Sequence, residues 1–530
     1  MTGPAASVRL VKDTYLDSVV QLSGTRAMRR VEGVEWATAA MATAANLGTL
    51  EGEGFDPDEW AGAGPGDLVL AVRASSDEAV AAAEEAGREA MFSARGDGAG
   101  PSAVEADPPT LQDAVARRAG SNVAVISVAG EYAALETHKA LTAGMDVLLF
   151  SDNVAVETEI ELKTRAARLG LLVMGPGAGT AMLGRTCLGF ANVVAPLAER
   201  QGAVAVVAAA GTGAQEAAAL LDRFGVGVTH VVGLGGRDLT AAVGGTMGRL
   251  ALRALAADRG TDAVLLVSKP PDPDVARRVV AEAGGMPLAA SLIGMDAPLS
   301  DDGSPRVVQA ATLEAGVLAT LAAIGVAAPD VHDGLRARVE TAAAALDPGR
   351  TLVRGLFSGG TLCYESLVVL GGVLGPVYSN TPVDEALTVP APPSSHVCLD
   401  LGEEEYTRGR PHPMIDPEAR IEHLREHGRD REVAAIVLDV VLGYGSHPDP
   451  AGELAPVCAG ILADGGPCVV VYVLGTEQDP QGFDAQRQAF RDAGCVVTET
   501  AARASFAAAA IARREPELAE RVVAVPGAGR

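Results

Sequence analysis

The chain repeats one plan twice, first in Gly202-Ala-Val-Ala-Val-Val-Ala-Ala-Ala-Gly-Thr-Gly-Ala-Gln-Glu216 and again in Leu352-Val-Arg-Gly-Leu-Phe-Ser-Gly-Gly-Thr-Leu-Cys-Tyr-Glu365. In each stretch an apolar run predicts a strand, a glycine-rich turn follows, and a helix begins. Glu216 and Glu365 stand at the same depth in the two helices. A strand that ends in a glycine turn before a helix is typical of parallel α/β sheets. Two related copies in one chain indicate a duplicated domain.

The two glycine turns predict the binding of an anion. A glycine turn at a helix N-terminus presents unpaired backbone N–H groups and the positive end of the helix dipole, which suits a phosphate. Glycine also ends strands tightly without any ligand, and for one copy alone this alternative has equal weight. The second copy favours the phosphate. The predicted phosphate-binding residues are Gly211, Thr212, Gly213, Ser358, Gly359, Gly360 and Thr361.

The two turns are expected to serve one site. The helices that begin near Thr212 and Thr361 should point their N-termini at a shared pocket, within one chain or between two copies of it. A valine at Gly213 or Gly360 is then expected to abolish turnover while leaving the fold intact, because a β-branched side chain closes the approach to the backbone.

Composition limits the classes of protein that fit. The chain has 530 residues, enough for three or four domains, and a net charge of −26. No basic patch stands out, which argues against a nucleic-acid or anionic-membrane partner. No run reaches about 18 uninterrupted apolar residues, and the beginning of the chain shows no signal-peptide pattern. The six cysteines lack the spacing of a zinc site or a disulfide framework, so we expect a cytoplasmic protein without a metal site.

The order of predicted elements gives an α/β protein of several domains. A small α+β domain of ferredoxin-like type comes first, and a stretch rich in Gly, Ala, Pro and acidic residues follows it as a linker. Alternating strands and helices then predict a Rossmann-like parallel sheet and two α/β domains that each contain one copy of the repeat. The predicted boundaries are 1–95, 96–117 (the linker), 118–200, 201–347 (with a helical tail) and 350–530.

Further strand ends supply charged candidates, because ligands of open parallel sheets gather at the C-terminal ends of the strands. One strand ends at Gly235-Gly236 before Arg237, and another ends before Lys269, whose loop is fixed by two following prolines. Lys269 and Arg237 are predicted to neutralise phosphate or carboxylate charge in a catalytic role. A solvated or structural ion pair is the alternative, equal in weight for Arg237 and lesser for Lys269.

A histidine in the last domain is the third catalytic candidate. His412 lies between Pro411 and Pro413 and follows Arg410, a predicted substrate-binding residue. A histidine between prolines is poorly placed to pack inside a helix or strand, which favours a hydrogen-bond donor or general acid–base at the rim of the pocket.

The motifs at these strand ends resemble the FdrA family, closely and in order over nearly the whole chain. That family is similar to both subunits of succinyl-CoA synthetase joined in one chain. The resemblance of this chain to the synthetase is weaker than its resemblance to FdrA and covers about residues 120–300 and 350–500. The resemblance to the synthetase implies a CoA-binding-like Rossmann domain and two flavodoxin-type domains. The stretches that carry the resemblance are Ser127-Val-Ala-Gly-Glu-Tyr-Ala133, Phe150-Ser-Asp-Asn-Val154, Gly211-Thr-Gly213 with Gln215-Glu216, Gly233-Leu-Gly-Gly-Arg-Asp-Leu239, Ser268-Lys-Pro-Pro271, Gly409–Pro417 and Gly475-Thr-Glu477.

The departures from the synthetase bear on the chemistry. The synthetase carries a phosphohistidine loop, but the chain has no histidine between His230 and His332, where that loop would stand. A differently patterned domain replaces the glycine-rich CoA loop before residue 120, and no room is left for an ATP-grasp domain. What remains is a phosphate site with no visible CoA or nucleotide site and no certain cofactor.

The FdrA resemblance implies a function in purine and allantoin breakdown. Its members are linked to carbamoyl exchange between oxalurate-type ureides and phosphate, which gives oxamate and carbamoyl phosphate, and they work with separate partner subunits. We therefore expect a carbamoyltransferase with a small-molecule substrate that forms a homo-oligomer and binds partner subunits. The alternatives are an acyl-CoA synthetase component and a non-catalytic regulatory or scaffold subunit.

Overall fold

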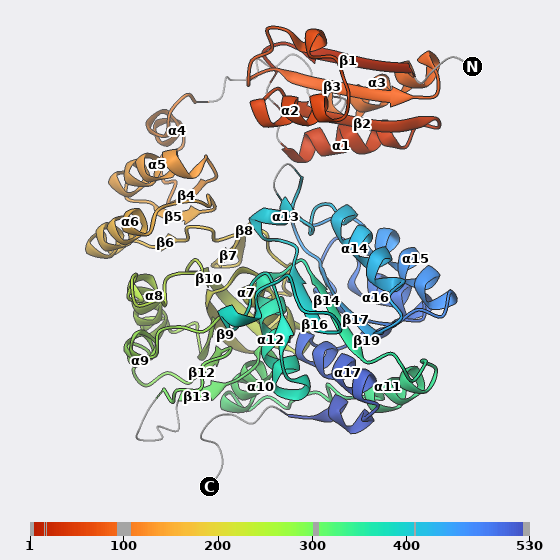
Figure 1. Ribbon diagram of the computed structural model, residues 1–530. Coiled ribbons are helices and arrows are strands. Elements are labelled where there is room, and N and C mark those ends of the chain that lie inside the picture. Colours follow the sequence, from red (N-terminus) through yellow and green to blue (C-terminus); the bar gives the residue numbers. More distant parts are fainter. Residues whose placement is uncertain are drawn as a thin grey trace. The chain divides into compact units, whose positions relative to one another are not determined.

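The computed structural model describes residues 5–14, 16, 18–92, 108–299, 307–407 and 410–522 (Figure 1). The chain forms two compact units. The first comprises Met1–Asp107 and Arg408–Pro411, and the second comprises Pro108–Thr407 and His412–Arg530. The α/β multidomain class expected from the sequence is confirmed, with three parallel or mostly parallel sheets in the second unit.

The first unit is a small α+β domain. Its antiparallel sheet has the order β1-β3-β2, and the alternating side chains of β3 are buried on both faces. One face packs against α1 and α3, and the other packs against a smaller cluster around Phe55 and Trp60. The elements are β1 (Ala5–Val11), α1 (Ser18–Arg29), β2 (Val34–Met41), α2 (Ala44–Gly52), β3 (Leu68–Ala74) and α3 (Asp77–Phe92).

Most of the predicted linker lies outside the described residues. Its last part forms the short helix α4 (Leu111–Arg117), which begins after Thr110, whose hydroxyl accepts a hydrogen bond from the N–H of Asp113. This helix packs on α5, so residues 111–117 belong to the domain that follows.

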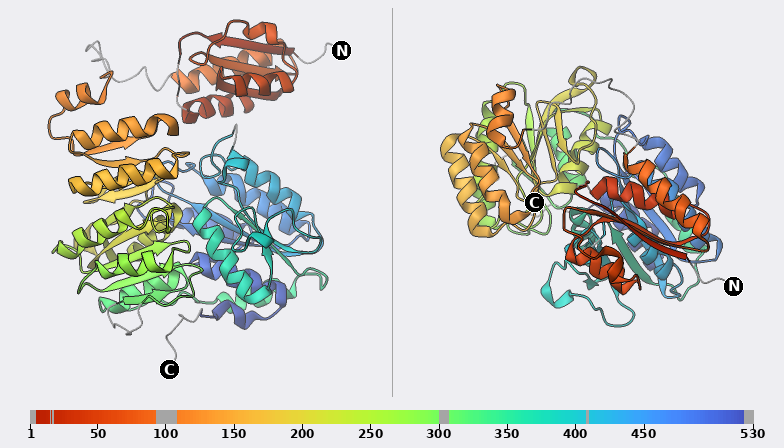
Figure 2. Two further views of the ribbon diagram at one scale, coloured as in Figure 1. Left: turned by 60° about the vertical axis from the view of Figure 1, so that its left-hand side comes forward. Right: turned by 90° about the horizontal axis from the view of Figure 1, so that it is seen from above.

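A three-stranded parallel sheet of order β4-β5-β6 begins the second unit, as the alternation of strands and helices predicted. Its helices join a column in which α4, α5, α6, α8 and α9 each pack on the next, visible along one side of this unit in Figure 2. The elements are β4 (Val123–Ile126), α5 (Gly130–Thr142), β5 (Asp146–Leu149), α6 (Val156–Leu169) and β6 (Val173–Met174).

The first copy of the repeat lies in a seven-stranded sheet of order β13-β12-β11-β9-β10-β7-β8. The hairpin β7–β8 falls within the predicted segment 118–200, yet β7 pairs antiparallel with β10 and so belongs to this later domain. The strands are β7 (Thr180–Leu183), β8 (Thr186–Gly189), β9 (Gln201–Ala209), β10 (Val226–Gly233), β11 (Ala263–Ser268), β12 (Leu288–Leu292) and β13 (Val307–Ala310), and the helices are α7 (Gly211–Arg223), α8 (Thr246–Ala257), α9 (Pro273–Ala281) and α10 (Leu313–Ala323).

The second copy lies in a six-stranded parallel sheet of order β15-β16-β14-β17-β18-β19. Its central strands are buried on both faces, which explains why their sequences are mostly apolar. The strands are β14 (Leu352–Phe357), β15 (Val377–Tyr378), β16 (His396–Asp400), β17 (Val433–Val441), β18 (Cys468–Leu474) and β19 (Val496–Thr498), and the helices are α11 (Leu335–Ala344), α12 (Gly360–Leu374), α13 (Glu404–Thr407), α14 (Glu418–Gly428), α15 (Pro450–Ala463), α16 (Phe483–Asp492) and α17 (Ala501–Arg513).

The two repeat domains pack through their first helices, and one hydrophobic core runs through both. Helices α7 and α12 lie in contact at the centre of the unit (Figure 1). The alanine-rich helix α17 is buried against the six-stranded sheet and α12, and it also contacts α10 of the first repeat domain. Alanine side chains permit this close approach of helix backbones. Among the described residues, every helix is too short or too polar to span a lipid bilayer.

Candidate functional site

The N-termini of α7 and α12 meet. The N–H of Thr361 donates a hydrogen bond of 3.3 Å to Thr212 Oγ1, across the boundary between the two repeat domains. A Cβ added at Gly359 would lie 2.7 Å from Thr212 Cγ2, and one at Gly213 would lie 2.8 Å from Thr361 Cγ2. The glycines of the two turns therefore let the helix ends approach each other. The juxtaposition expected from the sequence is present, and it forms within one chain.

Unpaired backbone donors lie at this junction. Neither helix has a side-chain hydrogen bond at its N-cap. Within the described part of the chain, the N–H groups of Gly211, Thr212 and Gly360 donate to no protein acceptor. Unsatisfied first-turn N–H groups and two positive dipole ends provide a place for an anion.

A cavity of about 300 Å³ opens at this junction. Eight of the predicted site residues line it, namely Gly211, Thr212, Gly236, Lys269, Ser358, Gly360, Thr361 and His412. Gly213, Gly235, Arg237, Gly359 and Arg410 are not part of its lining. Arg410 is exposed and is grouped with the first unit.

Lys269 supplies the positive charge of the cavity. It follows β11 directly, and its ammonium group makes no hydrogen bond or ion pair with any residue that the structure describes. A Cβ at Gly360 would lie 3.7 Å from Lys269 Nζ and 2.5 Å from Asp400 Oδ2, so Gly360 leaves room for both groups. Burial and the charge of Glu403 raise the pKa of Asp400 to about 6, against the opposing effect of Lys269.

His412 enters the cavity as a neutral hydrogen-bond donor. Its Nδ1 accepts a hydrogen bond of 3.3 Å from the N–H of Met414, which assigns the proton of the neutral ring to Nε2. Burial, followed by the charge of Arg420, lowers the pKa of His412 to about 4. At neutral pH the ring therefore presents Nε2–H to a ligand beside Gly402.

The Ser358-Gly359 turn is held by a buried carboxylate that the sequence analysis did not identify. Asp439 accepts hydrogen bonds of 2.8 Å from the N–H groups of both Ser358 and Gly359, and one of 3.0 Å from Ser358 Oγ. Arg420 pairs with Asp439 at 3.2 Å and also donates to its backbone carbonyl. The N–H groups of Ser358 and Gly359 thus fix the turn and are not directed at a ligand.

Arg237 takes part in a structural ion pair. Its Nε donates to Glu159 Oε2 at 2.8 Å and its terminal nitrogen donates to the carbonyl of Val154 at 2.7 Å. Glu159 also binds the fully buried Lys163 at 2.7 Å. Of the two alternatives left open for Arg237, the geometry favours the structural one. Gly235 has a φ of +81°, and its backbone packs against Pro176, so it serves local conformation.

The expectation that valine at Gly213 leaves the fold intact is wrong. Its Cβ would lie 2.8 Å from Thr361 Cγ2 and 2.9 Å from Val267 Cγ1, so valine would force α7 away from α12. Gly211 differs, because a Cβ there meets no atom within 4 Å and the residue lines the cavity.

Several residues of the site carried only a weak signal in the sequence. Asp439 is an acidic residue within the apolar strand β17, and this contrast is the one sign of its role. Asp400 lies at the end of β16, where a single acidic residue ends an otherwise largely apolar strand. Gln215 is buried one turn into α7 and donates to Asn192 Oδ1 at 3.4 Å.

Comparison with known proteins places the chain in a family. The Escherichia coli protein named "Uncharacterized protein YahF" is 37% identical over 512 residues, which cover 93% of this chain and 96% of that protein. The chain belongs to the YahF family. Residues 356–511 match the family described as "CoA-ligase", and residues 4–108 match "AllF, heavy metal-associated domain".

The chain is also similar, at lower coverage or lower identity, to CoA ligases. The Archaeoglobus fulgidus protein named "Succinate–CoA ligase [ADP-forming] subunit alpha 2" is 30% identical over 193 residues, which cover 36% of this chain and 64% of that protein. A dinucleotide-forming acetyl-coenzyme A synthetase of Ca. Korarchaeum cryptofilum aligns with 75% of this chain and 84% of its own at 15% identity, with a TM-score of 0.26. The sequence matches establish a relationship to the CoA-ligase and succinyl-CoA-synthetase-like proteins.

The family model that matches residues 4–108 is named for a heavy-metal-associated domain. This segment contains no cysteine and no histidine, two of the residue types that bind soft metal ions. Across the described residues, no group of three or more His, Cys, Asp or Glu side chains could hold a metal ion.

Proposed function

We propose that the chain transfers a carbamoyl group between an oxalurate-type ureide and inorganic phosphate at the cavity between α7 and α12, as an FdrA-type enzyme of purine and allantoin breakdown. A phosphate oxygen attacks the carbamoyl carbon, the bond from that carbon to the ureide nitrogen breaks, and the proton of hydrogen phosphate ends on the nitrogen of the leaving oxamate. The products are carbamoyl phosphate and oxamate. This step needs an anion site and a polarised carbonyl but no nucleotide.

The observation that carries the proposal is the meeting of two helix N-termini beside an unpaired ammonium group. The unpaired N–H groups of Gly211, Thr212 and Gly360 would hold the phosphate oxygens, and Lys269 would neutralise their charge. The Nε2–H of His412 would donate to the carbonyl oxygen of the ureide as negative charge develops on it. Because the pKa of His412 is about 4, the ring keeps this donor throughout the neutral range.

The test is release of carbamoyl phosphate from oxalurate and phosphate by the purified full-length chain, alone and with co-purified partner subunits. Turnover should need phosphate and should not depend on added CoA or ATP. If oxalurate gives no carbamoyl phosphate under either condition, the proposal fails.

A CoA-ligase component is the second candidate, favoured by the match of residues 356–511 to the CoA-ligase family. It predicts that turnover needs CoA and nucleotide and that the chain becomes phosphorylated. Incubation with labelled nucleotide or acyl phosphate separates the two candidates. Stoichiometric acid-labile, base-stable label on His412 would favour the ligase, whereas carbamoyl transfer leaves the chain unlabelled.

Filling the anion site at Gly211 should block phosphate without disturbing the fold. Leucine at this position projects into open space at the mouth of the cavity, and it improves helix propensity over glycine. We expect Gly211→Leu to weaken phosphate binding by about 10-fold or more, equivalent to ~1.4 kcal/mol, with an unchanged unfolding midpoint. Phosphate affinity is measured by calorimetry. Gly371→Leu, at the exposed far end of α12 where a Cβ is also unobstructed, is the control. Equal phosphate affinity in both variants would show that the two helix N-termini do not bind phosphate.

A further inference from the structure

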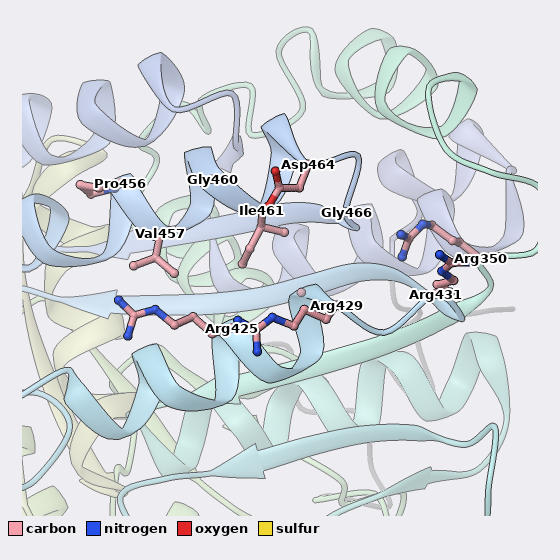
Figure 3. A pocket seen from close by; sticks show the side chains of 11 residues that line it. Arg350, Arg425, Arg429, Arg431, Pro456, Val457, Gly460, Ile461, Asp464 and Gly466 are labelled. Carbon is pink, nitrogen blue, oxygen red and sulfur yellow. The ribbon is translucent and has the colours of Figure 1, made fainter.

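A second basic hollow lies away from the cavity, in the six-stranded-sheet domain (Figure 3). It has a volume of about 560 Å³ and lies between the C-terminal ends of α14 and α15. Four arginines line it, namely Arg350, Arg425, Arg429 and Arg431, against one carboxylate, Asp464. In a chain with a net charge of −26, such a concentration of positive charge is unusual. We call this hollow the arginine groove.

Arginines often bind the carbonyl groups at the C-terminal ends of helices. Only one of these four arginines binds backbone carbonyl groups of the described residues, so this role does not explain the cluster. Arg350 is only 8% exposed and donates to the backbone carbonyls of Asp430, Val433 and Gly465, at 2.7, 2.9 and 3.2 Å. It therefore satisfies the carbonyl groups beneath the groove, which would otherwise repel an anion. Arg425, Arg429 and Arg431 are exposed, and their guanidinium groups make no hydrogen bond or ion pair within the described residues.

The form of the groove indicates the class of ligand. In Figure 3, Arg425 and Arg429 follow α14, while Arg350 and Arg431 lie together at the other end, so the positive charge is spread along the groove. A ligand that engages both ends must carry more than one anionic group. The opposite wall is apolar and consists of Pro456, Val457 and Ile461 from α15.

We propose that the arginine groove binds an oligophosphate, with a nucleoside di- or triphosphate as the ligand class that also uses the apolar wall. Planar guanidinium groups recognise phosphate oxygens through paired hydrogen bonds. The volume of about 560 Å³ falls within the range of roughly 300–1,000 Å³ found for small-molecule sites. This site is separate from the cavity between α7 and α12 and does not depend on the reaction catalysed there.

Calorimetric titration of the full-length chain at low salt tests the proposal, with tripolyphosphate, ATP and adenosine as probes. Tripolyphosphate and ATP should bind, and adenosine alone should not. If ATP binds more tightly than tripolyphosphate, the nucleoside of ATP contacts the apolar wall. If the two bind equally, the groove recognises the oligophosphate alone. Failure of both phosphate probes to bind, or binding of adenosine as tightly as ATP, would overturn the proposal.

Two kinds of variant localise the binding. Arg425→Gln with Arg429→Gln should weaken both phosphate probes by about 10-fold for each guanidinium removed. Gly460→Glu should do so without removing an arginine, because a Cβ at Gly460 meets no atom within 4 Å and the new carboxylate enters the groove. Gly460→Ala and Arg491→Gln, an exposed arginine of α16, are the matched controls. Gly211→Leu should retain the binding. Unchanged affinity in both groove variants, or its loss in Gly211→Leu, would place the ligand elsewhere.

Discussion

Replacing Lys269 by methionine should lower the turnover of oxalurate by about 10²–10³-fold, the usual loss when one charge-stabilising donor is removed from an anion site. Methionine keeps the length and the apolar stem of the side chain and removes only the ammonium group. The fold should be unaffected, because Lys269 makes no hydrogen bond or ion pair with any described residue. Steady-state kinetics with phosphate as the varied substrate, together with a thermal unfolding curve, measure both effects.

Two further variants test whether the loss of turnover is due to the charge at position 269. Lys269→Arg keeps the charge and should restore part of the activity. Lys139→Met removes a partly buried lysine that pairs with Glu136 on α5, far along the chain from the cavity, and should leave turnover unchanged. Asp400 provides a second readout, since loss of the nearby ammonium group should raise the pKa of its carboxyl above about 6. Full activity in Lys269→Met would mean that another group neutralises the phosphate.

The parts of the site that could be predicted from sequence are those set by short-range rules. Strand β9 and the turn at Gly211–Gly213 were predictable, because a buried parallel strand reads as an apolar run and a glycine turn marks the start of the next helix. The meeting of α7 with α12 was predictable from the duplication, because in both copies the N-terminus of the helix was expected to point at the same pocket. Lys269 could be placed because its strand end and its two prolines are visible in the sequence.

The partners of these residues could not be predicted, because they come from distant parts of the chain. Asp439 holds the N–H of Ser358 from 81 positions away, and the hydrogen bond from Thr361 to Thr212 Oγ1 spans 149 positions. For Arg237 the sequence left two interpretations with equal weight, and only the position of Glu159 decides between them. The hairpin β7–β8 was assigned to the wrong domain because its antiparallel pairing with β10 has no signature in a pattern of parallel strands.

The glutamates that the two repeats share lie on opposite sides of the same domain boundary. Glu216 of α7 accepts a hydrogen bond of 3.4 Å from the N–H of Ala501, at the N-terminus of α17. Glu365 of α12 accepts one of 2.6 Å from the N–H of Leu313, at the N-terminus of α10. Each repeat therefore caps a helix of the other domain, and each carboxyl keeps one oxygen without a hydrogen-bond partner among the described residues.

Burial raises the pKa of both carboxyls above the ordinary value for glutamate. It raises the pKa of Glu216 to about 7, and burial together with the charge of Glu216 raises the pKa of Glu365 to about 8. In the unfolded chain both groups titrate near 4.5. Between these values the unfolded chain has released protons that the folded chain still holds, so the free energy of unfolding falls as pH rises from about 4.5 and levels off above about 8.

The double variant Glu216→Gln, Glu365→Gln should therefore be more stable than the natural chain at alkaline pH. Glutamine keeps the oxygen that accepts from Ala501 or Leu313 and carries no charge at any pH. At pH 9 we expect a gain of at least ~3 kcal/mol in the free energy of unfolding, since each unit of pKa shift corresponds to about 1.36 kcal/mol. At pH 4.5 the gain should be close to zero. Denaturant unfolding at both pH values measures the difference, with Glu340→Gln on the exposed face of α11 as the control. A gain that is the same at both pH values would show that folding does not raise the pKa values of the two carboxyls.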